Sequence, residues 1–162
     1  MFKKILRWAL FGEPIETLYY RALKNYNRGN FYKFVSIVCL KKINRNYACY
    51  LSGKAIIGRY ISFPHPVGIV IGDGVIIADR VTIYQNVTLG AARIGEGDKG
   101  LYPRIGNNVV IFAGAKLIGD ISIGDGAVIG ANAVVTKNVP ANVSVVGIPS
   151  RIVGESVISQ QN

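Results

Sequence analysis

Residues 104–135, "RIGNNVVIFAGAKLIGDISIGDGAVIGANAVV", decide the fold. An aliphatic residue returns at every sixth position of this stretch, and a small or β-branched residue follows it four places later. An α-helix would repeat its apolar residues every three or four positions, and a half-buried strand would alternate every two. A period of six instead predicts short strands joined by tight corners, three of which complete one coil of a solenoid.

The same period covers most of the chain from about residue 56 onward. We expect the aliphatic residues to stack inward and the small or β-branched residues to let the chain turn. The aliphatic positions are Ile71, Ile77, Ile83, Leu89, Ile105, Ile111, Leu117, Ile123, Ile129 and Val135. The small or β-branched positions are Val75, Val81, Val87, Val109, Ala115, Ile121, Ala127, Ala133 and Val139. The fold class is therefore mainly β, a parallel β-helix of hexapeptide repeats.

The repeat is broken twice, and breaks in a regular pattern are where function is best sought. Phe63 and Ile71 are eight residues apart rather than six, and the extra residues surround Pro64-His65-Pro66, which contains the chain's one histidine. Leu89 and Ile105 are sixteen apart, across the polar, glycine-rich stretch "GAARIGEGDKGLYPR". That stretch predicts a loop at residues 91–104 that leaves the coil.

The residues before the repeat have a helical pattern. Apolar residues at helical spacing and the stop signal "NRGN" at 27–30 predict two helices within residues 14–50. Residues 2–11 fit a third, short amphipathic helix. We therefore divide the chain into a basic helical segment (1–50), the repeat domain (51–154) and a C-terminal tail (155–162).

The net charge of +10 is concentrated in the helical segment. Residues 1–50 carry ten Lys and Arg against two Glu, whereas the rest of the chain carries nine against seven. Such a basic, partly apolar segment fits either a solvated helix surface or contact with an anionic membrane surface. Nucleic acid is not favoured as a partner, because no motif of nucleic-acid binders accompanies the charge. With no apolar run of about 18 residues, we expect a cytoplasmic protein that can lie at the inner face of the membrane.

Cys39 and Cys49 are too few for a disulfide framework, and no Cys/His cluster has the spacing of metal ligands. We expect both to be small buried residues and the protein to use no metal.

Three stretches resemble the hexapeptide-repeat acyltransferases, close to the bacterial serine acetyltransferases. They are the histidine followed by "GIVIG", the rung "QNVTLG" and the closing "VGIPSRIVG", and the resemblance covers residues 55–154. It implies a left-handed coil, a homotrimer with active sites between subunits, and acetyl-CoA as co-substrate.

The resemblance also implies roles for individual residues. His65 would be the general base, because an imidazole has the pKa needed to take a proton from an acceptor hydroxyl. Backbone N–H groups near Gly90 and Ala91 would hold the oxyanion. The coenzyme would lie along Ala113, Gly114 and Ala131, and its phosphates would meet three cations that are equally well explained as solvated charges. These cations are Lys116, Lys137 and Arg151.

Three positions depart from the serine acetyltransferase pattern. Pro64 and Tyr50 stand where those enzymes have aspartates, and Tyr102 stands where they have a second active-site histidine. The groups that would hold the ammonium of serine are therefore missing. This favours a sugar hydroxyl of a bacterial surface polysaccharide (capsule, O-antigen or exopolysaccharide), or of its precursor, as the acceptor. The candidate acceptor-binding residues are Asn86, Arg93, Tyr102 and Arg104.

Other functions remain open. One is a serine O-acetyltransferase of cysteine biosynthesis, and another is a non-catalytic β-helix that serves as a scaffold or binding protein. A zinc enzyme of the carbonic-anhydrase type shares this kind of coil but needs three histidines at each site. One histidine per chain disfavours it.

Overall fold

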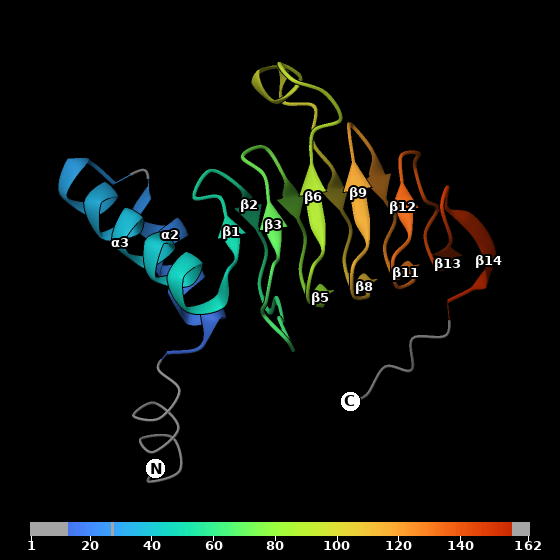
Figure 1. Cartoon of the computed structure of the whole chain (residues 1–162), viewed down its shortest axis with the longest axis horizontal. Helices are drawn as coiled ribbons and strands as arrows, with labels where there is room; N and C mark the ends of the chain where they lie inside the picture. Colours follow the sequence, from blue (N-terminus) through green and yellow to red (C-terminus); the bar gives the residue numbers. More distant parts are fainter. Residues whose placement is uncertain (1–12, 27, 157–162) are drawn as a thin grey trace, which may run out of the picture.

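The computed structural model describes residues 13–26 and 28–156, which form two helices followed by a β-helix (Figure 1). Helix α2 spans Ile15–Tyr26 and helix α3 spans Asn30–Tyr47, as the sequence predicted. The third helix expected at residues 2–11 lies outside the described residues. Within the described part of the chain, no helix combines the length and apolarity that crossing a membrane requires.

Helices α2 and α3 pack against each other, but only α2 buries its apolar stripe, because Phe31, Phe34 and Val38 of α3 are exposed. Helix α2 buries Ile15, Leu18, Tyr19 and Ala22. Helix α3 buries Ser36, Cys39 and Ile43 and is capped by Ala48, whose backbone is left-handed (φ 51°) and whose N–H donates to the Asn44 carbonyl. Cys39 and Cys49 are both free and buried, which confirms their expected role as small core residues.

The strands after the helices are mostly two residues long and form three sheets, which we call A, B and C. Sheet A contains β1 (Tyr50–Leu51), β3 (Val70–Ile71), β6 (Thr88–Gly90), β9 (Lys116–Ile118) and β12 (Val134–Val135). Sheet B contains β2 (Ile56–Ile57), β4 (Ile76–Ile77), β7 (Arg104–Ile105) and β10 (Ser122–Ile123). Sheet C contains β5 (Thr82–Ile83), β8 (Val110–Ile111), β11 (Val128–Ile129), β13 (Val143–Val146) and β14 (Arg151–Glu155).

Each coil visits the sheets in the order A, B, C, and each strand pairs in parallel with the equivalent strand of the next coil. Leu89 of β6, for example, lies between Ile71 of β3 and Leu117 of β9, so the inward residues stack in register. In Figure 1 the strands of sheet A run upward on the near side while the coil advances from left to right, so the coil is left-handed. This confirms the hand that the family resemblance implied.

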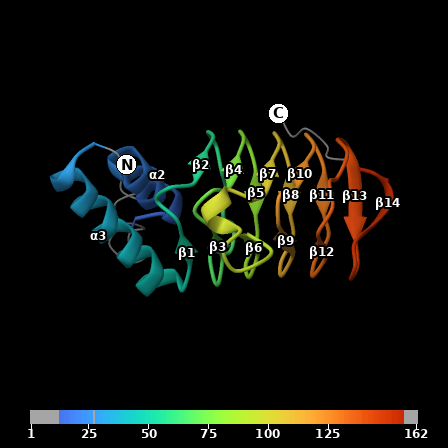
Figure 2. The same cartoon turned by 90° about the horizontal axis from the view of Figure 1, so that it is seen from above.

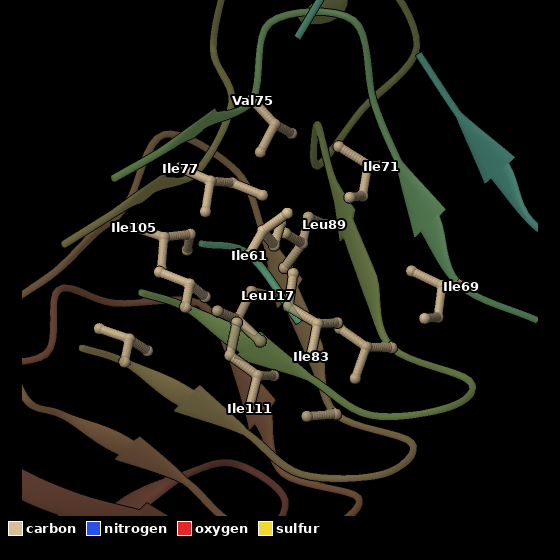
Figure 3. Packing of buried hydrophobic residues seen from close by; sticks show 14 of the residues in the cluster. Ile61, Ile69, Ile71, Val75, Ile77, Ile83, Leu89, Ile105, Ile111 and Leu117 are labelled. Carbon is tan, nitrogen blue, oxygen red and sulfur yellow. The ribbon is translucent and has the colours of Figure 1, made fainter. Parts of the chain in front are cut away.

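The interior of the coil is a column of aliphatic side chains (Figure 3). Every one of the ten aliphatic positions of the repeat is at most 3% exposed, and the small or β-branched positions are buried too. Burying a side chain of this size stabilises the fold by about 1.5–3 kcal/mol. The period of six places one well-buried aliphatic residue on each strand, and the burial of these residues holds the coil together.

Both ends of the coil are covered. At the first coil, the Tyr19 hydroxyl of α2 donates to the Ser52 carbonyl at 2.9 Å. At the last coil, β14 turns back and pairs antiparallel with β13. A solenoid needs such end elements because its terminal coils would otherwise expose the core and unpaired strand edges.

Two edges of sheet A matter for function. We call the corner where sheet C turns into sheet A the His65 edge, because the Phe63–Ile69 turn lies there, between the Ser62 bridge to β5 and strand β3. We call the corner where sheet A turns into sheet B the loop edge, because residues 91–103 leave the coil there. The loop contains the short 3₁₀ helix η1 (Gly97–Lys99) and projects from one side of the coil in Figure 1.

Candidate active site

His65 lies exposed on the surface of the first coil, within the turn that the break in the repeat predicted. The turn is held by its own backbone, because the Val67 N–H donates to the His65 carbonyl at 2.8 Å. The next coil holds it too, since the Asn86 N–H donates to the Val67 carbonyl at 2.8 Å. The flanking prolines fix φ on both sides of the histidine. A solvent-facing imidazole on a fixed backbone is open to a substrate hydroxyl.

Helix α2 anchors the chain just before His65. Glu16 accepts a hydrogen bond from the Phe63 N–H at 2.9 Å, and the Tyr19 ring lies 6.5 Å from the Phe63 ring. The Tyr20 hydroxyl donates to the Gly58 carbonyl at 2.7 Å and accepts from the Ile61 N–H at 3.1 Å. Burial is the main cause of a raised pKa at Tyr20, so this hydroxyl stays protonated and keeps both bonds. The helical segment thus positions the histidine turn.

An aromatic column runs along the His65 edge from coil to coil. The His65 and Tyr84 ring centroids are 6.1 Å apart, and Tyr84 stacks on Phe112 at 5.2 Å with 17° between the ring planes. Tyr84 and Phe112 each follow an inward residue of sheet C, so the repeat itself places them one above the other. Among the described residues, the His65 side chain makes no hydrogen bond. The Tyr84 ring is therefore the side chain that lies beside the imidazole.

Four predicted site residues lie on the same edge in later coils: Asn86, Ala113, Gly114 and Ala131. The amides of Ala113 and Ala131 have no hydrogen-bond acceptor within the described part of the chain, whereas those of Gly114 and Asn132 bond to the preceding coil. Gly114 has a φ of 75°, and a Cβ there would clash with Asn132 Oδ1. The edge therefore offers unpaired amides beside small side chains, as a slim, amide-rich ligand would require.

Lys116 lies next to this edge but is already engaged. Its ammonium donates to the Asn86 carbonyl at 2.5 Å and to Thr88 Oγ1 at 3.2 Å. It therefore ties two coils together and keeps one donor for a phosphate.

Gly90 and Ala91, the predicted oxyanion residues, lie on the loop edge. Gly90 still pairs with Ile118 in sheet A, whereas the Ala91 N–H has no acceptor among the residues that the structure describes. Ala91 is thus the better donor of the two. This N–H and His65 lie at opposite edges of sheet A.

The remaining candidates near the loop are held by protein contacts. Figure 2 shows the 91–103 loop lying over β3 and β6, and a Cβ at Gly72 or Gly74 would clash with the Tyr102 ring, which packs there. Arg93 lies beside Glu96 at 3.8 Å, and Arg104 pairs with Asp120 at 2.6 Å.

Lys137 and Arg151, two of the predicted phosphate partners, lie toward the C-terminal end of the coil. Lys137 is exposed and follows β12 on the loop edge. Arg151 begins β14 and donates to the Pro149 and Ser150 carbonyls. The structure therefore places the candidate residues in two groups on opposite edges of sheet A, with Arg151 in the terminal hairpin.

A groove of about 530 Å³ lies between α3 and the first coil. Tyr26, Tyr50, Lys54 and Asp73 are among the residues that line it. The Lys54 ammonium and then the Ser52 hydroxyl hold the pKa of Asp73 below its usual value. Position 50, where the serine acetyltransferases carry an aspartate, thus contributes an aromatic ring to this groove.

No group of three or more His, Cys, Asp or Glu side chains that could hold a metal ion occurs within residues 13–26 and 28–156.

Glu16, Tyr84 and Phe112 are the functional candidates that the sequence pattern did not single out. Tyr84 and Phe112 had a signal, because aromatic residues replace the small residue that often follows the aliphatic one. Glu16 had none, since it is 47 residues away from the backbone amide that it holds.

Comparison with known proteins agrees with the repeat and the fold. Residues 102–137 match the family model of the bacterial transferase hexapeptide (six repeats). The chain is 41% identical over 124 residues to a serine acetyltransferase of Buchnera aphidicola subsp. Acyrthosiphon pisum, covering 76% of this chain and 44% of the relative.

Two solved structures are similar over most of the chain. A serine acetyltransferase in complex with cysteine has a TM-score of 0.80 and 33% identity, covering 90% of this chain and 55% of that one. A serine acetyltransferase in complex with CoA has a TM-score of 0.73 and 33% identity, covering 86% and 55%. The chain spans about half the length of the relatives that it matches.

Proposed function

From its hexapeptide-repeat coil and its similarity to serine acetyltransferases, we propose that this protein is an acetyl-CoA-dependent O-acetyltransferase with His65 as general base. The observation that carries the proposal is the position of His65, exposed at the break in the repeat. Unpaired amides follow it on the same edge of the coil. A similar solved structure is a complex with CoA, which supports acetyl-CoA as the donor.

The proposed reaction needs a base, an oxyanion site and an acid. The neutral imidazole of His65 takes the proton of the acceptor hydroxyl as its oxygen attacks the thioester carbonyl. The negative charge that develops on the carbonyl oxygen is held by backbone N–H donors, of which Ala91 is the candidate with no other acceptor. When the tetrahedral intermediate collapses, the C–S bond breaks and the imidazolium returns its proton to the leaving thiolate.

The positions of these groups favour an active site shared between two chains. His65 and Ala91 lie on opposite edges of sheet A, so one reacting carbonyl can meet both only if they come from different copies. In a ring of chains joined head to tail, every interface brings His65 of one chain to Ala91 of the next. The homotrimer implied by the family resemblance fits this requirement.

For the acceptor, the comparisons favour serine over a sugar. The similar proteins and structures described above are named serine acetyltransferases, so L-serine is the first candidate. This reverses the order suggested by the departures at positions 50, 64 and 102. A sugar hydroxyl remains the second candidate, because the first coil holds Tyr50 and Pro64 in place of carboxylates. Aromatic rings such as Tyr50 and Tyr26 in a groove suit the apolar face of a sugar.

The test is acetyl-CoA-dependent thiol release by the purified full chain. Three acceptors are compared: L-serine, a bacterial surface polysaccharide from which the acetyl groups have been removed, and buffer alone. His65→Ala is expected to lower kcat by about 10²–10⁴-fold, the usual contribution of general base catalysis. Asn138→Ala, on the surface at the other end of the coil, serves as the matched control and should retain activity.

Each result has a distinct meaning. Release with L-serine that depends on His65 supports the first candidate, and release only with the polysaccharide supports the second. Undiminished release by His65→Ala would overturn the role of the histidine. No acetyl-CoA binding in calorimetry would instead favour a non-catalytic scaffold.

A further inference from the structure

Helix α3 has a free face opposite the one that it buries. Ser36, Cys39 and Ile43 point into the protein, whereas Phe31, Phe34 and Val38 on the other side are 73%, 64% and 49% exposed. Large exposed apolar side chains gathered on one element mark an interaction site more often than scattered ones do. This face therefore needs an explanation that the proposed reaction does not supply.

Toward the C-terminal end of α3, the same face forms a depression lined by cations, which we call the cationic hollow. Val38, Lys41, Lys42 and Arg45 line a depression of about 380 Å³. Together with Phe31 and Phe34 they follow one helical stripe, because their spacing of three and four residues keeps them on one side of the helix. From Phe31 to Arg45, a rise of fourteen residue steps, the stripe is about 21 Å long. Apolar groups lie at its N-terminal half and positive charges at its C-terminal half.

No negative charge offsets these cations locally. Residues 17–72 contain nine Lys and Arg and no Asp or Glu. Within the described residues, none of the three cations of the hollow forms an ion pair. The complementary partner is therefore anionic as well as apolar.

We propose that this face of α3 docks the protein on a bilayer that contains anionic phospholipid. A nucleic acid or an acidic glycan would satisfy Lys41, Lys42 and Arg45 but would leave Phe31 and Phe34 in contact with polar groups. A bilayer surface satisfies both halves of the stripe, because aromatic side chains enter the acyl boundary while lysine and arginine stay at the phosphates. The sequence alone suggested membrane contact for residues 1–50 as a whole. The structure assigns it to one stripe of one helix.

Helix α3 lies at one end of the molecule, while the coil extends away from the helices (Figure 1). Docking through α3 would leave both edges of sheet A accessible.

The first experiment is sedimentation of the full chain with vesicles. Vesicles of phosphatidylcholine alone are compared with vesicles of equal parts phosphatidylcholine and phosphatidylglycerol, without acetyl-CoA or acceptor. Each cation near an anionic surface contributes about 1 kcal/mol, or about fivefold in partitioning. The variant Lys41→Gln/Lys42→Gln/Arg45→Gln should therefore bind the anionic vesicles roughly a hundredfold more weakly. Lys24→Gln/Arg80→Gln/Lys99→Gln, with the same loss of charge elsewhere, should bind much as the unchanged protein does.

A second experiment reports on the apolar half of the stripe. Trp8 is the one tryptophan of the chain, so Trp8→Phe/Phe34→Trp carries a single fluorophore on α3. Its emission should shift to the blue with anionic vesicles and stay unchanged with phosphatidylcholine. Dextran sulfate, a soluble polyanion, should bind the cations without shifting the emission.

Four results would overturn the proposal. These are absence of binding to anionic vesicles, equal binding by the α3 triple variant, binding without an emission shift at position 34, and a shift produced equally by dextran sulfate. If Phe34→Ser instead converts an oligomer into a smaller species and vesicles do not bind, a second copy covers the face. Because no turnover is measured, any of these failures leaves the proposed acetyltransferase function as it stands.

Discussion

At the scale of single residues, the imidazole of His65 is held in a different way from that of a histidine that is hydrogen-bonded to a carboxylate. Its side chain makes no hydrogen bond among the described residues, and its ring contact is with Tyr84, 6.1 Å away between centroids. Tyr84 is itself supported by stacking on Phe112. We infer that aromatic packing and the two prolines restrict the imidazole, so Tyr84 is a positioning residue.

This role predicts a difference between two substitutions. Tyr84→Ala should lower kcat by up to about tenfold, since an aromatic pair contributes about 0.5–1.5 kcal/mol. Tyr84→Phe keeps the ring and should retain nearly full kcat. The KM for acetyl-CoA should change little in either variant, which steady-state kinetics with varied acetyl-CoA would check. Equal losses in both variants would assign the effect to the hydroxyl rather than to the ring.

At the scale of elements, helix α2 acts as a clamp on the first coil. Glu16, Tyr19 and Tyr20 all contact the segment between Gly58 and Phe63, and Tyr19 also bonds to the Ser52 carbonyl. A hydrogen bond from a backbone N–H to a carboxylate contributes about 1.5–3 kcal/mol. The clamp is therefore strong enough to affect both the stability of the first coil and the position of the turn after it.

We accordingly expect Glu16→Ala to lower the free energy of unfolding by about 1.5–3 kcal/mol, since the buried Phe63 amide loses its acceptor. The substitution should also lower kcat, because the histidine turn loses a contact. Glu16→Gln keeps an acceptor oxygen and should largely rescue both quantities, as urea denaturation and steady-state kinetics would show. Thr17→Ala, on the exposed side of α2, is the matched control. A Glu16→Ala variant with unchanged kcat would limit the clamp to a structural role.

At the scale of the whole molecule, the division of the site between two edges is the main consequence of the fold. A coil with three faces places residues that follow one another in sequence on different sides of the molecule. His65 and Ala91 are only 26 positions apart, yet sheet A lies between them. We therefore propose that a complete site requires a second chain.

Mixing two inactive variants tests this arrangement. His65→Ala lacks the base, and Ala91→Pro lacks the N–H donor, so each should be nearly inactive alone. If both are unfolded together at equal amounts and refolded, random assembly should give roughly a quarter of the sites an intact His65 and an intact Ala91. Activity should recover to about that fraction in the thiol-release assay. Ala91→Gly, which keeps the N–H, should be active without mixing, and no recovery in the mixture would place the whole site within one chain.

Much of this molecule follows from the sequence alone. The period of six determined the coil and its inward residues, because a stacked coil can bury only a side chain that recurs once per strand. The two breaks located the His65 turn and the loop, since extra residues in a regular coil must leave it. The helices were equally predictable, because their apolar residues recur at helical spacing.

Only the tertiary structure decided which candidates share a surface. The contact between His65 and Tyr84 depends on how coils stack, and the bond between Glu16 and Phe63 depends on how a helix docks against the coil. Neither contact can be predicted from the spacing of residues along the sequence. His65 and Tyr84 lie in successive coils, and Glu16 lies in a helix 47 residues before Phe63. For the same reason, the sequence could not show which face of α3 is exposed. The sequence determines which residues share a face of a helix, but the packing of the helix against the rest of the protein decides which face remains exposed.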